Sequence, residues 1–124
     1  MRETSDAIID SRKAVLESLL ACQGDLGRIA QRLRTFPWDS DELVTLTVDH
    51  IQSVLERYVG GELSAAEVEH WADLIECRDD ISYDETIKEL ISELANPVLS
   101  GRLNVLKAQS LLVRLRKLQQ SKSR

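Results

Sequence analysis

Apolar residues recur along this chain at the three- and four-residue spacing of amphipathic helices. The clearest stripe consists of Val68, Trp71, Ala72 and Ile75. It lies in the segment GELSAAEVEHWADLIECRDD, where Ser64 and Glu67 have the spacing of a capping box. In a capping box each side chain accepts a hydrogen bond from an otherwise unpaired amide of the first helical turn. The pattern therefore predicts a helix from about residue 65 to Arg78, with Trp71 in the core.

The same periodicity predicts five further helices, near residues 6–21, 26–35, 48–59, 84–95 and 105–118. Their expected N-caps include Ser5, Asp25, Thr47 and Asn104, and the expected stops include Gly60-Gly61 and Asn96-Pro97. Residues 44–48, VTLTV, favour a strand but have no evident partner, so we interpret them as a loop leading into the next helix. Residues 79–84 are expected to form a short connection.

The connections between the expected helices are short, which favours packing of helices that follow each other in sequence. We therefore predict an all-α fold, a single compact bundle of five to six antiparallel helices. Its one domain spans residues 1–124, with a frayed tail at 119–124. A chain of 124 residues is long enough to bury a core without metal or disulfide support.

Composition indicates a cytoplasmic location. No apolar run is long enough to span a bilayer, and the N-terminal segment mixes charges with two adjacent isoleucines, unlike a signal peptide. Cys22 and Cys77 are far apart in sequence and form no C-x-x-C motif. We expect two reduced, mostly buried thiols rather than a disulfide.

Charge is distributed unevenly along the chain. Residues 1–60 hold seven Lys and Arg against ten Asp and Glu, and residues 61–97 hold two against eleven. Residues 98–124 hold seven basic residues and no acid. The acidic middle and the basic end could neutralise each other by packing together, which is the simpler interpretation, or could serve two different partners.

Metal binding and catalysis receive little support from the motifs. Glu67 and His70 supply half of the paired E-x-x-H motif of di-iron bundles, and the other histidine, His50, lacks the glutamate. His70, Asp73 and Cys77 share helical spacing, but ligands from one helix rarely complete a metal shell. The chain has no glycine-rich phosphate loop and no nucleophile with an evident base. We therefore expect no metal, no cofactor and no enzymatic activity.

Protein binding is the function that the charge pattern favours most. Glu69, Asp73 and Glu76 follow each other at four- and three-residue spacing, where like charges destabilise a helix. A basic partner would offset this repulsion, whereas an ordinary solvated face is the alternative. The predicted partner-binding residues are Glu69, Asp73, Glu76, Arg78, Asp79 and Asp80. Arg78 could instead act internally, with its guanidinium forked between Glu76 or Asp80 and the next helix.

Nucleic-acid binding is the alternative function. Lys107, Arg114 and Lys117 share one face of the last expected helix, and a basic stripe is typical of phosphate contacts. A pI of about 5.0 and the lack of aromatic residues among these basic positions disfavour it. No membrane contact is expected, and the sequence does not indicate an oligomeric state.

Several short segments carry a resemblance to a known group of proteins. They are FPWD (36–39), LT (46–47), GELSAAEVEHWADLIECRDDI (61–81) and ELANP (93–97), of which the WAxxIExRDDI block is the most specific. Over residues 36–118 the chain resembles a group of small all-α bacterial proteins without established function. In size, charge and class it is loosely similar to acidic immunity proteins, which neutralise basic nuclease toxins. This similarity implies a non-enzymatic interaction module with a basic protein partner, and it implies no catalytic residue.

Overall fold

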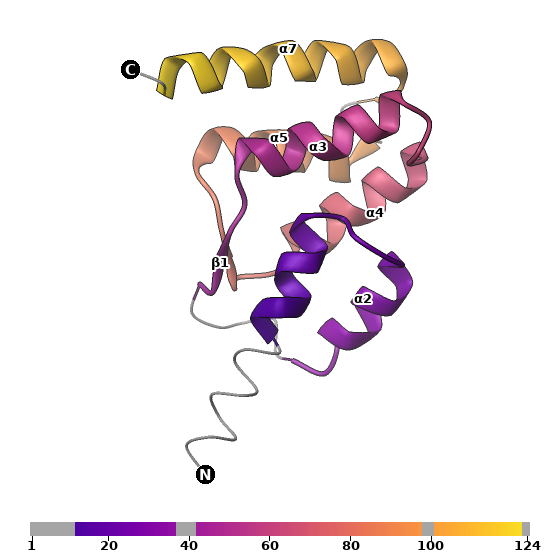
Figure 1. The fold of residues 1–124 in the computed structure, drawn as a ribbon, viewed down its shortest axis with the longest axis vertical. Helices are drawn as coiled ribbons and strands as arrows, with labels where there is room; N and C mark the ends of the chain where they lie inside the picture. Colours follow the sequence, from indigo (N-terminus) through magenta and orange to yellow (C-terminus); the bar gives the residue numbers. More distant parts are fainter. Residues whose placement is uncertain (1–11, 37–41, 98–100, 123–124) are drawn as a thin grey trace.

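The chain forms helices joined by short connections and a small strand pair in the computed structural model, which describes residues 12–36, 42–97 and 101–122 (Figure 1). Residues 12–20 form the first helix described. It is followed by α2 (Leu26–Leu33), α3 (Val48–Val59), α4 (Ala65–Glu76), α5 (Glu85–Ala95) and α7 (Val105–Lys122). The predicted all-α class is confirmed. The predicted cap at Ser5 lies outside the described residues, and α7 continues beyond its predicted end at Leu118.

The helices begin where the capping residues predicted that they would. Side-chain oxygens of Asp25, Asp84 and Asn104 accept hydrogen bonds from the backbone amides of Gly27, Ile87 and Lys107 at 2.8, 2.9 and 2.8 Å. The Thr47 amide donates to Nδ1 of His50 at 3.0 Å. After α3, Gly61 has a φ of +84°, a left-handed conformation that glycine adopts without a Cβ clash. Local sequence therefore sets these helix boundaries.

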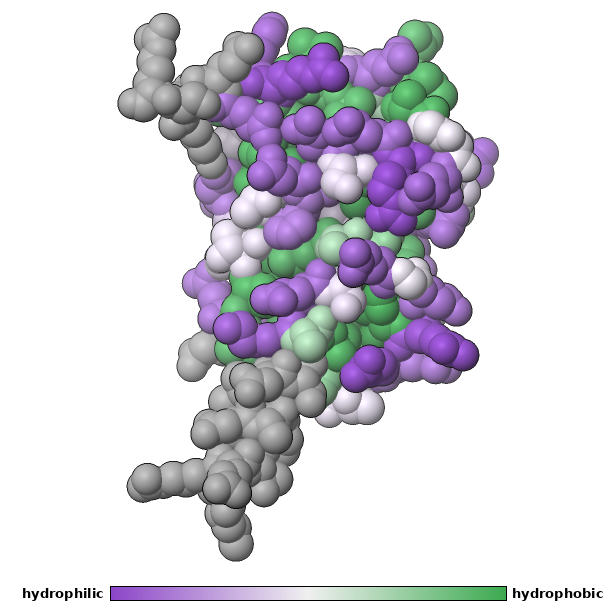
Figure 2. Space-filling model, viewed as in Figure 1, coloured by the Kyte–Doolittle hydropathy of each residue, from purple (hydrophilic) through white to green (hydrophobic). Residues whose placement is uncertain are grey.

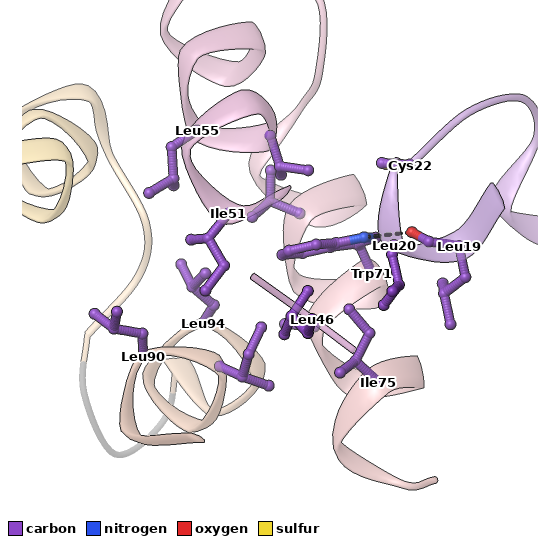
Figure 3. Close-up of a cluster of buried hydrophobic side chains, with 14 of the residues drawn as sticks. Leu19, Leu20, Cys22, Leu46, Ile51, Leu55, Trp71, Ile75, Leu90 and Leu94 are labelled. Atoms are coloured by element: carbon purple, nitrogen blue, oxygen red, sulfur yellow. Dashed lines mark hydrogen bonds between the residues drawn. The ribbon is translucent and has the colours of Figure 1, made fainter. Parts of the chain in front are cut away.

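The core is built around Trp71, as its apolar stripe predicted. Its side chain is completely buried, and its indole Nε1 donates to the backbone oxygen of Leu19 at 2.6 Å (Figure 3). Aliphatic side chains fill the space around the indole, among them Leu46 and Ile51 from other segments and Ile75 from α4 itself. The buried hydrophobic residues form one cluster that includes members of every helix described. Trp71 thus joins α4 to the first helix through both packing and a hydrogen bond.

The prediction that residues 44–48 form only a loop is wrong for the first two of them. β1 (Val44–Thr45) pairs in parallel with β2 (Ile81–Ser82), with Val44 opposite Ile81. The amide of Leu46 also donates to the oxygen of Ser82 at 2.9 Å. The partner strand lies in the connection expected after α4, and a pattern within one segment cannot reveal a partner so far along the chain. Residues 46–47 do lead into α3, as predicted.

The two most extensive helix contacts include one pair that is not adjacent in sequence. The principal helix pairs are α4 with α5 and α3 with α7, so α7 packs mainly along α3 rather than on the acidic α4 and α5. Among the described residues, one ion pair links α7 to α5, with Arg114 Nη1 at 3.5 Å from Glu93 Oε1. The buried side of α7 consists of Ala108, Leu111, Leu112 and Leu115. The expectation that the basic C-terminal segment packs mainly on the acidic helices is therefore wrong, because α7 packs mainly on α3. Burial of an aliphatic side chain is worth more than an exposed ion pair.

Candidate partner-binding surface

The register of α4 determines which of its acidic residues are exposed. Ser64 Oγ accepts from the Glu67 amide at 3.1 Å, and Glu67 Oε1 accepts from the Ser64 amide at 3.0 Å, so the predicted capping box is present. The buried side of α4 consists of Val68, Trp71, Ala72 and Ile75. Glu69, Asp73 and Glu76 lie away from it and are exposed, as is Asp79 in the following connection. We define these four carboxylates as the acidic surface.

Electrostatics at the end of α4 is locally unfavourable. A helix C-terminus carries a partial negative charge, which basic residues in the last turn usually compensate. The last turn of α4 has no basic residue, and it contains Asp73 and Glu76. A charge of the unfavourable sign at this position typically costs about 0.3–1 kcal/mol at low salt. A bound cationic group would relieve both the repulsion between these carboxylates and the interaction with the helix dipole.

The acidic surface also affects two neighbouring titratable groups. The pKa of the Cys77 thiol is raised, mainly by partial desolvation from neighbouring atoms and further by the charges of Asp73 and Glu76. The pKa of the Tyr83 hydroxyl is raised by burial and by Glu76 and Asp79. In both cases nearby negative charge disfavours the anion. The region between the end of α4 and β2 therefore has a negative potential.

Cys77 provides a measurable probe of this potential. Because its pKa is raised, we expect the rate of Cys77 alkylation by iodoacetamide to rise at a higher pH than for a free cysteine. The double variant Asp73→Asn, Glu76→Gln should shift this pH profile part of the way toward that of a free cysteine. The shift should be incomplete because desolvation raises the pKa of Cys77 more than the two carboxylates do. The measurement is the rate at Cys77 against pH, followed by peptide mapping. Glu56→Gln on α3 is the control and should leave the profile unchanged. Equal profiles in all variants would show that the carboxylates do not act on the thiol.

The two cysteines differ in exposure. Cys22 is buried and Cys77 is exposed, and both are free. The expectation of two mostly buried thiols is therefore wrong for Cys77. Helical periodicity alone did not place Cys77 because it is the C-cap of α4, where the helix ends and side chains turn outward.

Asp80 lies in the interior rather than on the acidic surface. Its side chain is completely buried. Its carboxylate accepts hydrogen bonds from Arg12 Nε at 3.0 Å and Nη2 at 2.9 Å, and from Arg78 Nε and Nη2, both at 2.9 Å. The prediction that Asp80 is available to a partner is wrong. The internal contact of Arg78 with Asp80, one part of the predicted alternative, is confirmed, and its Nη1 also donates to the backbone oxygen of Leu33 in α2 at 3.5 Å.

Asp80 and its two arginine partners, Arg12 and Arg78, form a group that we call the Asp80 cluster. With the neighbouring Phe36 and Leu43, this cluster connects four segments of the chain. The backbone oxygen of Asp80 accepts from the Leu43 amide at 2.8 Å, just before β1. The guanidinium of Arg12 lies over the ring of Phe36, 5.7 Å from its centroid, which adds a cation–π contact. Arg12 was missed from sequence, although a signal existed. It lies three and four positions before the buried Val15 and Leu16, so it is a charge on the apolar face of its helix.

A groove runs between the end of α2 and α4, beside the acidic surface. Its volume is about 720 Å³. It is lined by Ala30, Leu33, Arg34, Thr35, Phe36, His70, Asp73, Leu74, Cys77 and Arg78. The structure thus brings Asp73 of the acidic surface next to the apolar side chains of Leu33 and Leu74. Of the other predicted partner-binding residues, Arg78 also lines this groove.

The candidate metal ligands His70, Asp73 and Cys77 all line the groove. Within the described ranges, however, no three His, Cys, Asp or Glu side chains lie close enough together to hold a metal ion. Their spacing along one helix places them on one side of α4 without bringing their donor atoms to a common point. The groove therefore offers apolar contacts bordered by polar groups rather than a set of converging ligands.

Comparison with known proteins finds no matching family model, curated protein or solved structure. None of the helices in the described part of the chain is both long and apolar enough to cross a membrane.

Proposed function

We propose that the protein is a non-enzymatic interaction module that binds a basic protein through the acidic surface. One observation carries this proposal. Three exposed carboxylates, Asp73, Glu76 and Asp79, lie at or just beyond a helix C-terminus that has no basic residue in its last turn, and the exposed Glu69 precedes Asp73 by one turn. The adjacent arginine, Arg78, does not compensate them at the surface because its guanidinium is turned inward to Asp80. Such an arrangement costs stability in the free protein, and a basic partner would recover that cost.

The groove supports a protein partner rather than a small cation. Interfaces gain most of their affinity from a few apolar or aromatic anchors seated in pockets, and surrounding charges mainly steer association. Here the half-buried side chains of Phe36 and Leu74 supply apolar contacts in the groove that Asp73 also lines. An anchor side chain next to a lysine or arginine of the partner would fit both features.

The particular partner we propose is a basic toxin, which makes the protein an immunity-type inhibitor. A nuclease must present positive charge to bind the phosphate backbone of its substrate. An acidic protein that covers such a surface excludes the substrate and associates rapidly because the charges attract. The small size, the net charge of −5 and the all-α fold of this chain are compatible with that role.

Reversal of charge on the acidic surface is expected to slow association with the partner. With a partner obtained by co-purification from the native host, Glu69→Lys, Asp73→Lys and Asp79→Lys should each reduce the association rate constant. Together they should lower it by roughly tenfold or more at low salt and flatten its salt dependence. The measurement is stopped-flow or surface-plasmon-resonance kinetics at two ionic strengths.

The matched control is Glu56→Lys, which makes the same charge change at an exposed position of α3. It should change the association rate much less than the acidic-surface variants do. If all four variants, shown to be folded, associate with the partner at the parent rate, the carboxylates form only a solvated face and the proposal fails.

A second candidate is contact with nucleic acid through α7, where Arg114 and Lys117 of the predicted basic stripe are exposed and Lys107 is half-buried. Those basic residues share their face with exposed aliphatic side chains, which phosphates do not favour as neighbours. We therefore place nucleic acid second.

A further inference from the structure

A second face of α7 is apolar and exposed. In the part of the chain that the structure describes, the exposed large hydrophobic side chains are Val105, Leu106 and Val113, at 47%, 79% and 48% exposure. All three belong to α7. Figure 2 shows hydrophobic surface at the upper right, over the beginning of this helix. Single exposed aliphatic residues are normal, but several on one helix face are typical of an interaction site.

Helical geometry places two of these three residues together. At 100° per residue, Leu106 and Val113 point to the side opposite Ala108, Leu111, Leu112 and Leu115, which are buried, and Val105 lies at the edge between the two sides. Gln109 lies between Val105 and Val113, and Arg116 and Lys117 continue the same face one turn further on. We define Val105, Leu106, Val113, Arg116 and Lys117 as the outer face of α7. It lies at one end of the long axis of the molecule, whereas the first helix and α2 lie at the other (Figure 1).

We propose that the outer face of α7 binds an amphipathic helix of another protein, one that carries an apolar stripe flanked by acidic residues. The apolar part comes from Leu106 and Val113, which lie two turns apart on the exposed side of α7, at the i and i+7 spacing that a second helix can contact. The acidic part comes from charge complementarity, because Arg116 and Lys117 are exposed and residues 98–124 contain no Asp or Glu. This surface is separate from the acidic surface, so the inference does not depend on the proposed function.

Other occupants fit the outer face less well. Nucleic acid would leave Leu106 against phosphate, and α7 offers no aromatic residue for base stacking. A membrane surface would gain little, because the larger apolar side of α7 is already buried in the core. A symmetric second copy would bring the basic residues of two α7 helices close together.

The first step of the test is a peptide selection. A display library of 16-residue helical peptides is selected on the immobilised full-length protein, after depletion on the Leu106→Gln, Val113→Gln variant. Both positions are exposed, so the variant should have the parent melting temperature. We expect the recovered peptides to combine apolar residues at i, i+3 or i+4, and i+7 with flanking Asp and Glu. Recovery of no peptide, or of peptides without acidic enrichment, would overturn the proposal.

The second step measures affinity with one recovered peptide by fluorescence anisotropy. Leu106→Gln should weaken binding at least about tenfold, as expected for an anchor residue. Arg116→Glu with Lys117→Glu should weaken it by a similar factor at low salt and reduce its salt dependence. The matched control is Arg28→Glu with Arg32→Glu, which reverses two exposed basic residues of α2 and should change the dissociation constant less than about twofold. Equal affinity for the parent and Leu106→Gln would contradict the proposal.

Three parallel measurements identify the other occupants. Duplex DNA that binds the parent and Leu106→Gln equally, but not the Arg116→Glu, Lys117→Glu variant, would assign the face to nucleic acid. Binding of phosphatidylserine-containing vesicles that both variants abolish would assign it to a membrane surface. A dimer in sedimentation experiments that Leu106→Gln dissociates would assign it to a second copy. Each of these results would overturn the proposal.

Discussion

Replacement of Asp80 by Asn is expected to lower the free energy of unfolding by about 3–5 kcal/mol, because it leaves two arginines without their buried carboxylate. The side chains of Arg12 and Arg78 are only 11% and 8% exposed, so water cannot replace the lost charge. Asn keeps the approximate shape of Asp, so the effect reports charge rather than volume. The measurement is urea unfolding followed by circular dichroism, with a common m-value.

The matched control is Asp79→Asn, the same substitution one residue earlier. Asp79 is exposed, and its replacement should change stability by no more than about 0.5 kcal/mol. A domain of this kind is typically stable by about 5–15 kcal/mol, so the Asp80 variant should retain enough folded protein for measurement. Unfolding of both variants at the same urea concentration would mean that the Asp80 cluster is not isolated from water.

Truncation of Trp71 to Ala is expected to cost about 3–5 kcal/mol of stability. The substitution removes the largest completely buried side chain and leaves a cavity between α4 and the first helix. It also removes the donor to the backbone oxygen of Leu19, which would remain buried without that hydrogen bond. The midpoint of urea unfolding should fall clearly below that of the parent.

Two further variants separate the components of the Trp71 effect. Trp71→Phe keeps an aromatic ring but not the indole donor, so it should destabilise less than Trp71→Ala. Leu106→Ala is the control for loss of a large hydrophobic side chain at an exposed position, and it should be close to neutral. If Trp71→Ala unfolded with the parent midpoint, the register of α4 described above would be wrong.

Local chemistry explains why the helices could be predicted closely from sequence. Each apolar stripe has the helical period, and residues such as Asp25, Ser64 and Asn104 satisfy amides within their own first turn. These interactions span only a few residues and do not depend on the rest of the fold. The same argument placed Trp71 inside, because its stripe allows only one side of α4 to face the core.

The acidic surface could be predicted only in part. Glu69, Asp73 and Glu76 are exposed because they lie on the side of α4 opposite its apolar stripe. Beyond the end of the helix the period no longer applies, and Asp79 and Asp80 look alike in the sequence. One is exposed and the other is the most buried charge in the described structure. Their difference depends on Arg12, which is 68 positions away from Asp80.

Helical periodicity and capping motifs were sufficient to predict the all-α class, the helix boundaries at the capped ends and the side of each helix that is buried. These properties follow from apolar spacing and hydrogen bonds within one or two turns. The pairing of β1 with β2, the packing of α7 on α3 and the burial of Asp80 between two arginines became evident only in the folded chain. Each of these depends on contacts between segments distant in sequence, whose free energies of burial and charge pairing have no counterpart in the local pattern.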